Sequence, residues 1–366
     1  MNNQTRFRNL DMLRGFIMIL MAIDHCYSIF YQTHYAESWN SSIPNYGSLA
    51  IFFTRWISNI CAPGFALLMG MGMIFSFSRK LKVLDKRTIT LHFIKRGIIL
   101  ILLQQFLDLS FLILKLSTLE KSPPFRGGIL YALGFSLIFS SFFIKLPYRV
   151  QILLGTIILL TNYFIASTIL ISVSNNTIIN LLFIPGVNKF SSVNYPAFPW
   201  LGITIIGLGI GGFIIKNSNL IKINYFKTGV TFLIVFILLR FLNFGDYSHI
   251  VNSNNIIDFL AVIKYPPSIE FVIMTMGLLS LSLGAINKFE TYSIIKPLLV
   301  FGQAPLFFYF AHLYLFIILS KFTNHAFPLS VMYLFWIVGL IIIFPMCKYY
   351  IQFKSHKPNS SLWRYF

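Results

Sequence analysis

Long apolar runs separated by short polar loops make up most of the chain. Ten runs reach or approach the roughly 20 residues that a helix needs to cross a bilayer core of about 30 Å. This pattern predicts an all-α integral membrane protein, a bundle of about ten transmembrane helices. The seventh run is short, and we interpret it as tilted or partly re-entrant. The runs cover about 10–30, 52–77, 93–114, 128–144, 151–173, 198–215, 228–242, 268–286, 298–320 and 328–350.

The density of lysine and arginine alternates from one loop to the next. With the N-terminus in the cytoplasm, the cytoplasmic segments hold 20 of these residues and the opposite loops hold 6. Cytoplasmic loops of membrane proteins carry such an excess of positive charge. The sequence therefore predicts that both the N- and C-termini are cytoplasmic. The longer polar loops, 31–50, 174–197 and 243–267, then lie outside.

The composition supports a membrane protein and excludes some other classes. Hydrophobic residues make up 57% of the chain and charged residues only 11%, whereas about a quarter of a soluble domain is charged. A net charge of +19 can indicate nucleic-acid binding, but here the basic residues lie in short loops. We expect the lipid bilayer as partner and no nucleic acid. The three cysteines lack metal-ligand spacing, so we expect no metal.

The chain shows no second domain and no internal repeat. We therefore treat 1–366 as a single multi-pass membrane domain, with a core of about 6–350. Many transporters are built from inverted repeats, so the missing repeat counts against that class.

The first apolar run carries ionisable residues, which are costly in lipid and mark candidate functional sites. Arg14 and His25 are eleven residues apart, which is about 16 Å along a helix and about 20° from three full turns. They therefore share one helix face. Asp24 points about 100° away from His25. Asp11 and Arg14 could also be a simple helix-end staple.

Further polar residues lie at the ends of runs that this topology places outside. Together they predict an outward-facing polar pocket. A purely structural role stays open for three of the candidate residues. His25 or His312 could simply hydrogen-bond across helices, and Asp108 could be a buried partner for Arg55 or for a histidine. The residues are Arg55, Gln104, Asp108, Arg240 and His312.

Ordered motifs give the chain a family resemblance. The segment 10–15, Leu-Asp-Met-Leu-Arg-Gly, followed by 21–25, Met-Ala-Ile-Asp-His, resembles the start of bacterial proteins related to the heparan-α-glucosaminide N-acetyltransferase catalytic domain. The spacing of Arg14 and His25 also resembles the first span of the acyltransferase-three membrane enzymes, which belong to the same transmembrane acyltransferase superfamily. The other similar segments, in order, are 53–57, 61–65, 195–202, 240–246, 264–277 and 302–312.

The resemblance implies a membrane-bound acyltransferase in a bacterial inner membrane. Such an enzyme would move an acetyl or other acyl group from cytosolic acetyl-CoA or another acyl-CoA to an amine or hydroxyl of a sugar or glycan on the outer side. His25 would be the general base or would be transiently acylated. Asp24 or Asp108 would orient its ring, and Asp24 is disfavoured by its direction. Arg14 and Arg55 would bind acyl-CoA, and the acceptor site would contain Gln104, Trp200, Arg240 and His312.

Two other functions use the same residues differently. A transporter or flippase for a sugar-lipid or anionic substrate would use the polar face as a pathway. A non-catalytic membrane scaffold would need Arg14, Asp24 and His25 only for stability. The sequence leaves the acceptor, the acyl group, N- versus O-transfer and a homodimer open.

Overall fold

The structure, a computed structural model, describes residues 3–31, 45–113, 123–169, 176–217, 224–247, 255–323, 327–358, 361 and 363. Helices dominate this part of the chain, which confirms the all-α prediction. Some basic residues that support the predicted topology lie outside the described residues: Lys115, Lys121, Lys222 and Arg364.

Eight helical segments of the described chain are long and apolar enough to cross a membrane. They confirm a multi-pass membrane protein, while the count of ten spans and the orientation of the termini stay predictions. In two of them, shorter helical elements continue the main helix. The segments are α1 (Asn3–Cys26) with η1 (Tyr27–Tyr31); α2 (Leu49–Trp56), η2 (Ile57–Ile60) and α3 (Cys61–Lys80) together; α4 (Lys86–Ile113); α6 (Tyr148–Ile169); α8 (Ala197–Lys216); α9 (Tyr225–Leu242); α11 (Ile269–Phe289); and α14 (Leu329–Ser355).

Two predicted runs have a different form from the others. The run at 128–144 is the shorter helix α5 (Ile129–Phe143). The run at 298–320 is broken into α12 (Lys296–Gln303), preceded by η3 (Ser293–Ile295), and α13 (Pro305–Ser320), with a 92° bend between them. Pro305 causes this break, because proline lacks an N–H and disfavours a helical conformation at the residue before it.

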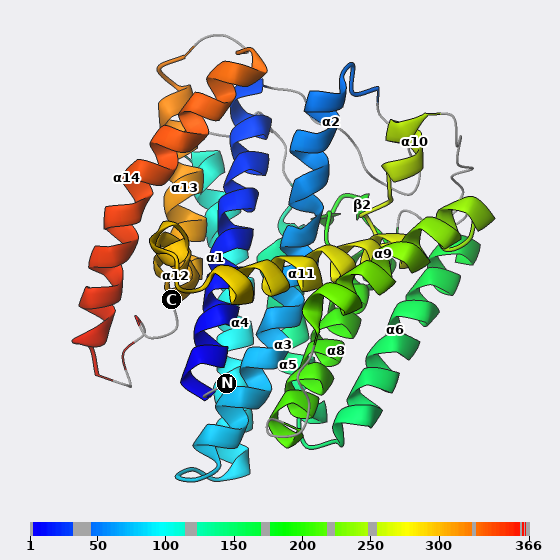
Figure 1. The fold of residues 1–366 in the computed structure, drawn as a ribbon, viewed down its shortest axis with the longest axis vertical. Helices are drawn as coiled ribbons and strands as arrows, with labels where there is room; N and C mark the ends of the chain where they lie inside the picture. The colour runs from blue at the N-terminus through cyan, green and yellow to red at the C-terminus, as the bar shows by residue number, and fades with distance from the viewer. Residues whose placement is uncertain are drawn as a thin grey trace.

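The remaining elements are short and lie in the connections between the long helices. β1 (Phe125–Gly127) pairs parallel with β3 (Ser191–Val193), which pairs antiparallel with β2 (Gly186–Val187). The short helices are α7 (Thr177–Leu182) and α10 (Ile256–Leu260). Figure 1 shows α2 and α10 at the end of the bundle away from the N-terminus. The predicted outer loops thus contain regular structure.

Helix α1 lies in the middle of the bundle, and α12 is pressed against it (Figure 1). A Cβ atom on Gly15 would collide with the carbonyl oxygen of Leu298, and one on Gly302 would collide with the carbonyl oxygen of Asp11. Only glycine allows two backbones to approach this closely. This contact fixes α12 against α1 and thereby sets where α13 begins.

Candidate functional site

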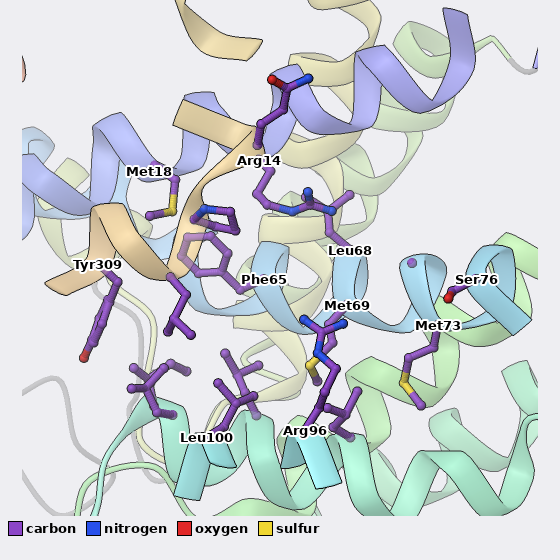
Figure 2. Close-up of a pocket in the computed structure, with 18 of the residues that line it drawn as sticks. Arg14, Met18, Phe65, Leu68, Met69, Met73, Ser76, Arg96, Leu100 and Tyr309 are labelled. Carbon is purple, nitrogen blue, oxygen red and sulfur yellow. The ribbon is translucent and has the colours of Figure 1, made fainter. Parts of the chain in front are cut away.

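A cavity of about 370 Å³ lies among α1, α3, α4, α5, α13 and α14. Its basic lining residues are Arg14 from α1, Arg96 from α4 and Lys354 from α14. Most other lining side chains are methionine, leucine, isoleucine and phenylalanine, and Tyr309 of α13 completes the wall. Figure 2 shows Arg14 and Arg96 reaching into the cavity from facing walls, with Tyr309 standing apart from them. The cavity thus combines a cationic region with an apolar interior.

Arg14 is held in place from two sides. Its Nη1 donates to Asp11 Oδ1 at 2.6 Å and to the carbonyl oxygen of Gly302 at 3.1 Å. The staple to Asp11 considered from the sequence is therefore present, and the same guanidinium also lines the cavity. Because Gly302 lies in the last turn of α12, the cation is tied to the helix break as well as to α1.

His25 of α1 and His312 of α13 are in direct contact. Nδ1 of His25 lies 2.7 Å from Nε2 of His312, and the two rings stack with centroids 5.0 Å apart. The Tyr309 ring lies 6.2 Å from the His25 ring and 5.9 Å from the His312 ring, centroid to centroid. Tyr309 therefore connects the cavity with this histidine pair.

Asp24 faces a different group of residues. Its carboxylate forms an ion pair with Arg55 of α2, and the charge of the buried Lys264 also acts on it. The Arg55 guanidinium carbon lies 5.9 Å from the centre of the Tyr27 ring. Asp24 is thus the counter-ion of a cation, consistent with the expectation that it points away from His25. A part for Asp24 and Arg55 in catalysis or acyl-CoA binding stays a prediction.

Gln104 and Asp108 lie one turn apart on α4. The Gln104 amide donates to Asp108 Oδ2 at 2.8 Å, and its oxygen accepts from the backbone N–H of Leu130 at 3.1 Å. Asp108 is bonded to Gln104 and acts electrostatically on Tyr309. These contacts favour a role in joining α4 to α5, and substrate or catalytic roles for the two residues stay predictions.

Trp200 is completely buried at the start of α8 and packs on Tyr195, with ring centroids 5.4 Å apart. Its indole Nε1 has no hydrogen-bond partner among the described residues. The Tyr195 hydroxyl contacts the Tyr265 hydroxyl at 3.0 Å. Burial raises the pKa of Tyr195 well above its ordinary value, so this phenol stays protonated. The acceptor contact expected for Trp200 from the sequence remains a prediction.

Arg240 is completely buried and bonded on all sides. It donates to Glu270 Oε2 at 2.6 Å and to Asp246 Oδ2 at 3.3 Å. It also donates to the carbonyl oxygens of Phe259 and Asp258, each at 2.7 Å. These contacts join α9, α10 and α11, so they favour a structural role over the predicted acceptor contact.

The structure brings only some of the predicted site residues together. Arg14 lines the cavity, while His25 and His312 meet beside it. Sequence reasoning missed Tyr309 as the connection, although it lies one helical turn before His312 and so shares its face. It also missed Lys354, which it used only as a cytoplasmic charge. Within the described residues, no group of three or more His, Cys, Asp or Glu side chains could hold a metal ion.

Comparison with known families gives one result for this chain. Residues 6–240 match the model of the heparan-α-glucosaminide N-acetyltransferase catalytic family. No curated protein matches the sequence. The matched region includes the first span with Arg14 and His25, and it covers more than half of the chain. The membrane-spanning fold and the match together indicate an acetyltransferase-like membrane protein, and the chain belongs to the heparan-α-glucosaminide N-acetyltransferase catalytic family.

Proposed function

We propose that this protein transfers an acetyl or other acyl group from acyl-CoA to an amine or hydroxyl of a sugar or glycan across the membrane. One observation carries the proposal: a single cavity has a cationic region and also reaches Tyr309, whose ring packs on the histidine pair. A donor held by its charged part in this cavity would present its acyl group close to His25.

The lining of the cavity suits acyl-CoA in two ways. Arg14, Arg96 and Lys354 match the phosphate groups of CoA, because guanidinium and ammonium groups bind phosphate strongly. The apolar walls match the uncharged pantetheine arm. The roughly 16 Å between Arg14 and His25 along α1 is a distance that this arm can cover. The positive loop charges support a cytoplasmic position for the cationic region.

His25 would act first as general base and then as general acid. Its imidazole would take a proton from the acceptor amine or hydroxyl as that group attacks the thioester carbonyl. A new C–N or C–O bond would form, and the C–S bond would break. His25 would return the proton to the sulfur, which would leave as the free thiol of CoA. The acceptor would approach from the end of α1 where Asp24 lies, close to Arg55 of α2 and to Lys264.

The test is release of free CoA by the purified protein in lipid nanodiscs. We expect release from acetyl-CoA to increase when a glucosaminide with a free amine is added, and the acetylated sugar to appear in equal amount. His25→Ala should lower the rate by at least about 100-fold, because a general base contributes 10²–10⁴-fold. His356→Ala, at an exposed helix end, is the matched control and should keep full activity.

Reconstitution of the same purified protein into sealed vesicles separates the enzyme from a transporter. Movement of labelled sugar across a vesicle membrane without CoA release would contradict the acyltransferase and support the transporter or flippase. Full activity of His25→Ala would remove this histidine from the mechanism.

A further inference from the structure

We propose that His312 is a positioning residue that fixes the tautomer of His25, so that Nε2 of His25 is the basic nitrogen. This inference rests on the proposed function for its consequence, but its structural part can be tested without any acyl transfer. It gives His312 a role different from the acceptor contact expected from the sequence. The proposal follows from two hydrogen bonds and the burial of one ring.

The first hydrogen bond sets the proton on His312. Its Nδ1 lies 2.7 Å from the backbone carbonyl oxygen of Phe308, one turn earlier in α13. A carbonyl oxygen can only accept, so Nδ1 of His312 carries a hydrogen. The His312 side chain is completely buried and stacks on the Phe308 ring, with centroids 5.1 Å apart. A charged ring in such surroundings would be costly, so His312 is neutral and its Nε2 has a free lone pair.

The second hydrogen bond determines which nitrogen of His25, on α1, carries the hydrogen. Nε2 of His312 lies 2.7 Å from Nδ1 of His25. Because Nε2 of His312 accepts, Nδ1 of His25 must donate. A neutral His25 then has no hydrogen on Nε2, and this nitrogen is free to take a proton. His25 is partly exposed, whereas His312 is fully buried, so the basic nitrogen belongs to the ring that a substrate can reach.

The arrangement also favours the protonated state of His25 during turnover. When Nε2 takes a proton, Nδ1–H still points at the lone pair of His312, and the hydrogen bond becomes charge-assisted and stronger. A buried partner that holds a catalytic histidine in one tautomer and stabilises its charged form is the role of the third member of a hydrolase triad. Here an imidazole backed by a main-chain carbonyl would fill that role in place of a carboxylate.

The structural test is the ¹⁵N spectrum of histidine-labelled full-length protein in nanodiscs. The His25 signals are assigned by their loss in His25→Gln. We expect a protonated Nδ1 and an unprotonated Nε2 on His25. A His25 protonated on Nε2 overturns the inference, whether or not the protein is active. The expected tautomer in a protein that transfers no acyl group contradicts the proposed function and leaves the tautomer assignment standing.

The kinetic test compares His312→Gln with His312→Leu, two side chains of similar size. Glutamine has an amide oxygen that can accept from Nδ1 of His25, and leucine has none. We expect His312→Leu to lower kcat by about 10- to 100-fold, the effect that losing a histidine's hydrogen-bond partner has at metal sites, with KM for acetyl-CoA within about twofold. His312→Gln should recover most of the lost kcat. Equal losses in both variants, or a loss confined to KM, would overturn the inference.

Discussion

Three arginines inside the spans, Arg14, Arg55 and Arg240, differ in whether their surroundings leave the guanidinium group accessible to a ligand. Each needs a partner, because a lone charge in lipid is costly. Arg55 and Arg240 have carboxylates for this purpose. Arg14 has Asp11 and still faces the cavity. Of these three arginines, Arg14 is the one that lines the cavity.

Arg96 provides a direct test of donor binding at this scale. We expect Arg96→Gln to raise KM for acetyl-CoA about fivefold to tenfold, because it removes a cation from the cavity wall and leaves the chemical step intact. kcat should change little. Arg149→Gln, an exposed arginine on α6 outside this cavity, is the control. An unchanged KM in Arg96→Gln would argue against phosphate binding at this end of the cavity.

Arg240 is expected to act through stability. Arg240→Met would leave Glu270 and Asp246 buried without their cation, and breaking such a group costs about 3–5 kcal/mol. We expect a large loss of thermal stability of the purified protein. A variant with normal stability and a raised KM for the acceptor sugar would instead support the acceptor contact that the sequence predicted for Arg240.

How much of the site could be predicted depends on how local each feature is. The shared face of Arg14 and His25 follows from helix geometry alone, and both residues lie at or beside the cavity. The pairing of His25 with His312 joins residues nearly 300 positions apart and depends on how α13 is oriented. No local rule gives that pairing. For the same reason the sequence suggested Asp24 or Asp108 as orienting residues, whereas the ring that contacts His25 is His312.

At the scale of elements, the break between α12 and α13 determines where Tyr309 and His312 of α13 lie. The apolar run at 298–320 predicted one span, since apolar residues lie on both sides of Pro305. Proline ends the first helix, and the glycine contacts with α1 determine where that end lies. The other long helices follow the apolar runs closely, because in lipid each span must satisfy its own backbone hydrogen bonds.

Gly15→Ala tests this contact. The added methyl group would collide with the backbone of α12, and overpacking of this kind costs about 1–3 kcal/mol. We expect lower thermal stability and a lower kcat, because α13 and His312 would move relative to His25. Gly212→Ala, whose added methyl group would lie 3.1 Å from the Cβ of Tyr148 and no closer than 3.9 Å to a backbone atom, should have a much smaller effect. Wild-type kcat in Gly15→Ala would show that the close contact does not position the histidine pair.

At the scale of the whole molecule, the two ends of the bundle contain different elements, and the loops predicted to be cytoplasmic hold most of the lysine and arginine. The N-terminus and the turn between α3 and α4 lie at one end, and α2 and α10 lie at the other (Figure 1). The proposed path enters near the first end, and the proposed acceptor approaches from the second. This division requires that the first end face the cytoplasm.

Single cysteines can measure that orientation in intact cells. The native cysteines Cys26, Cys61 and Cys347 are all buried, so labelling should report the added thiol. We expect a membrane-impermeant maleimide to label Lys189→Cys from outside and to label Asp85→Cys only after the cells are opened. Both positions are exposed. The reverse pattern would invert the topology and place the cationic region outside.

The central claim is that the cavity brings the acyl group of acyl-CoA to the histidine pair. The most direct measurement is photo-crosslinking with a CoA thioester whose acyl group carries a diazirine, followed by peptide mapping. We predict that the label falls on α13 around Tyr309 or on the α1 segment from Met18 to His25, and that excess acetyl-CoA prevents it. Labelling on other helices, or labelling that acetyl-CoA does not reduce, would contradict the claim.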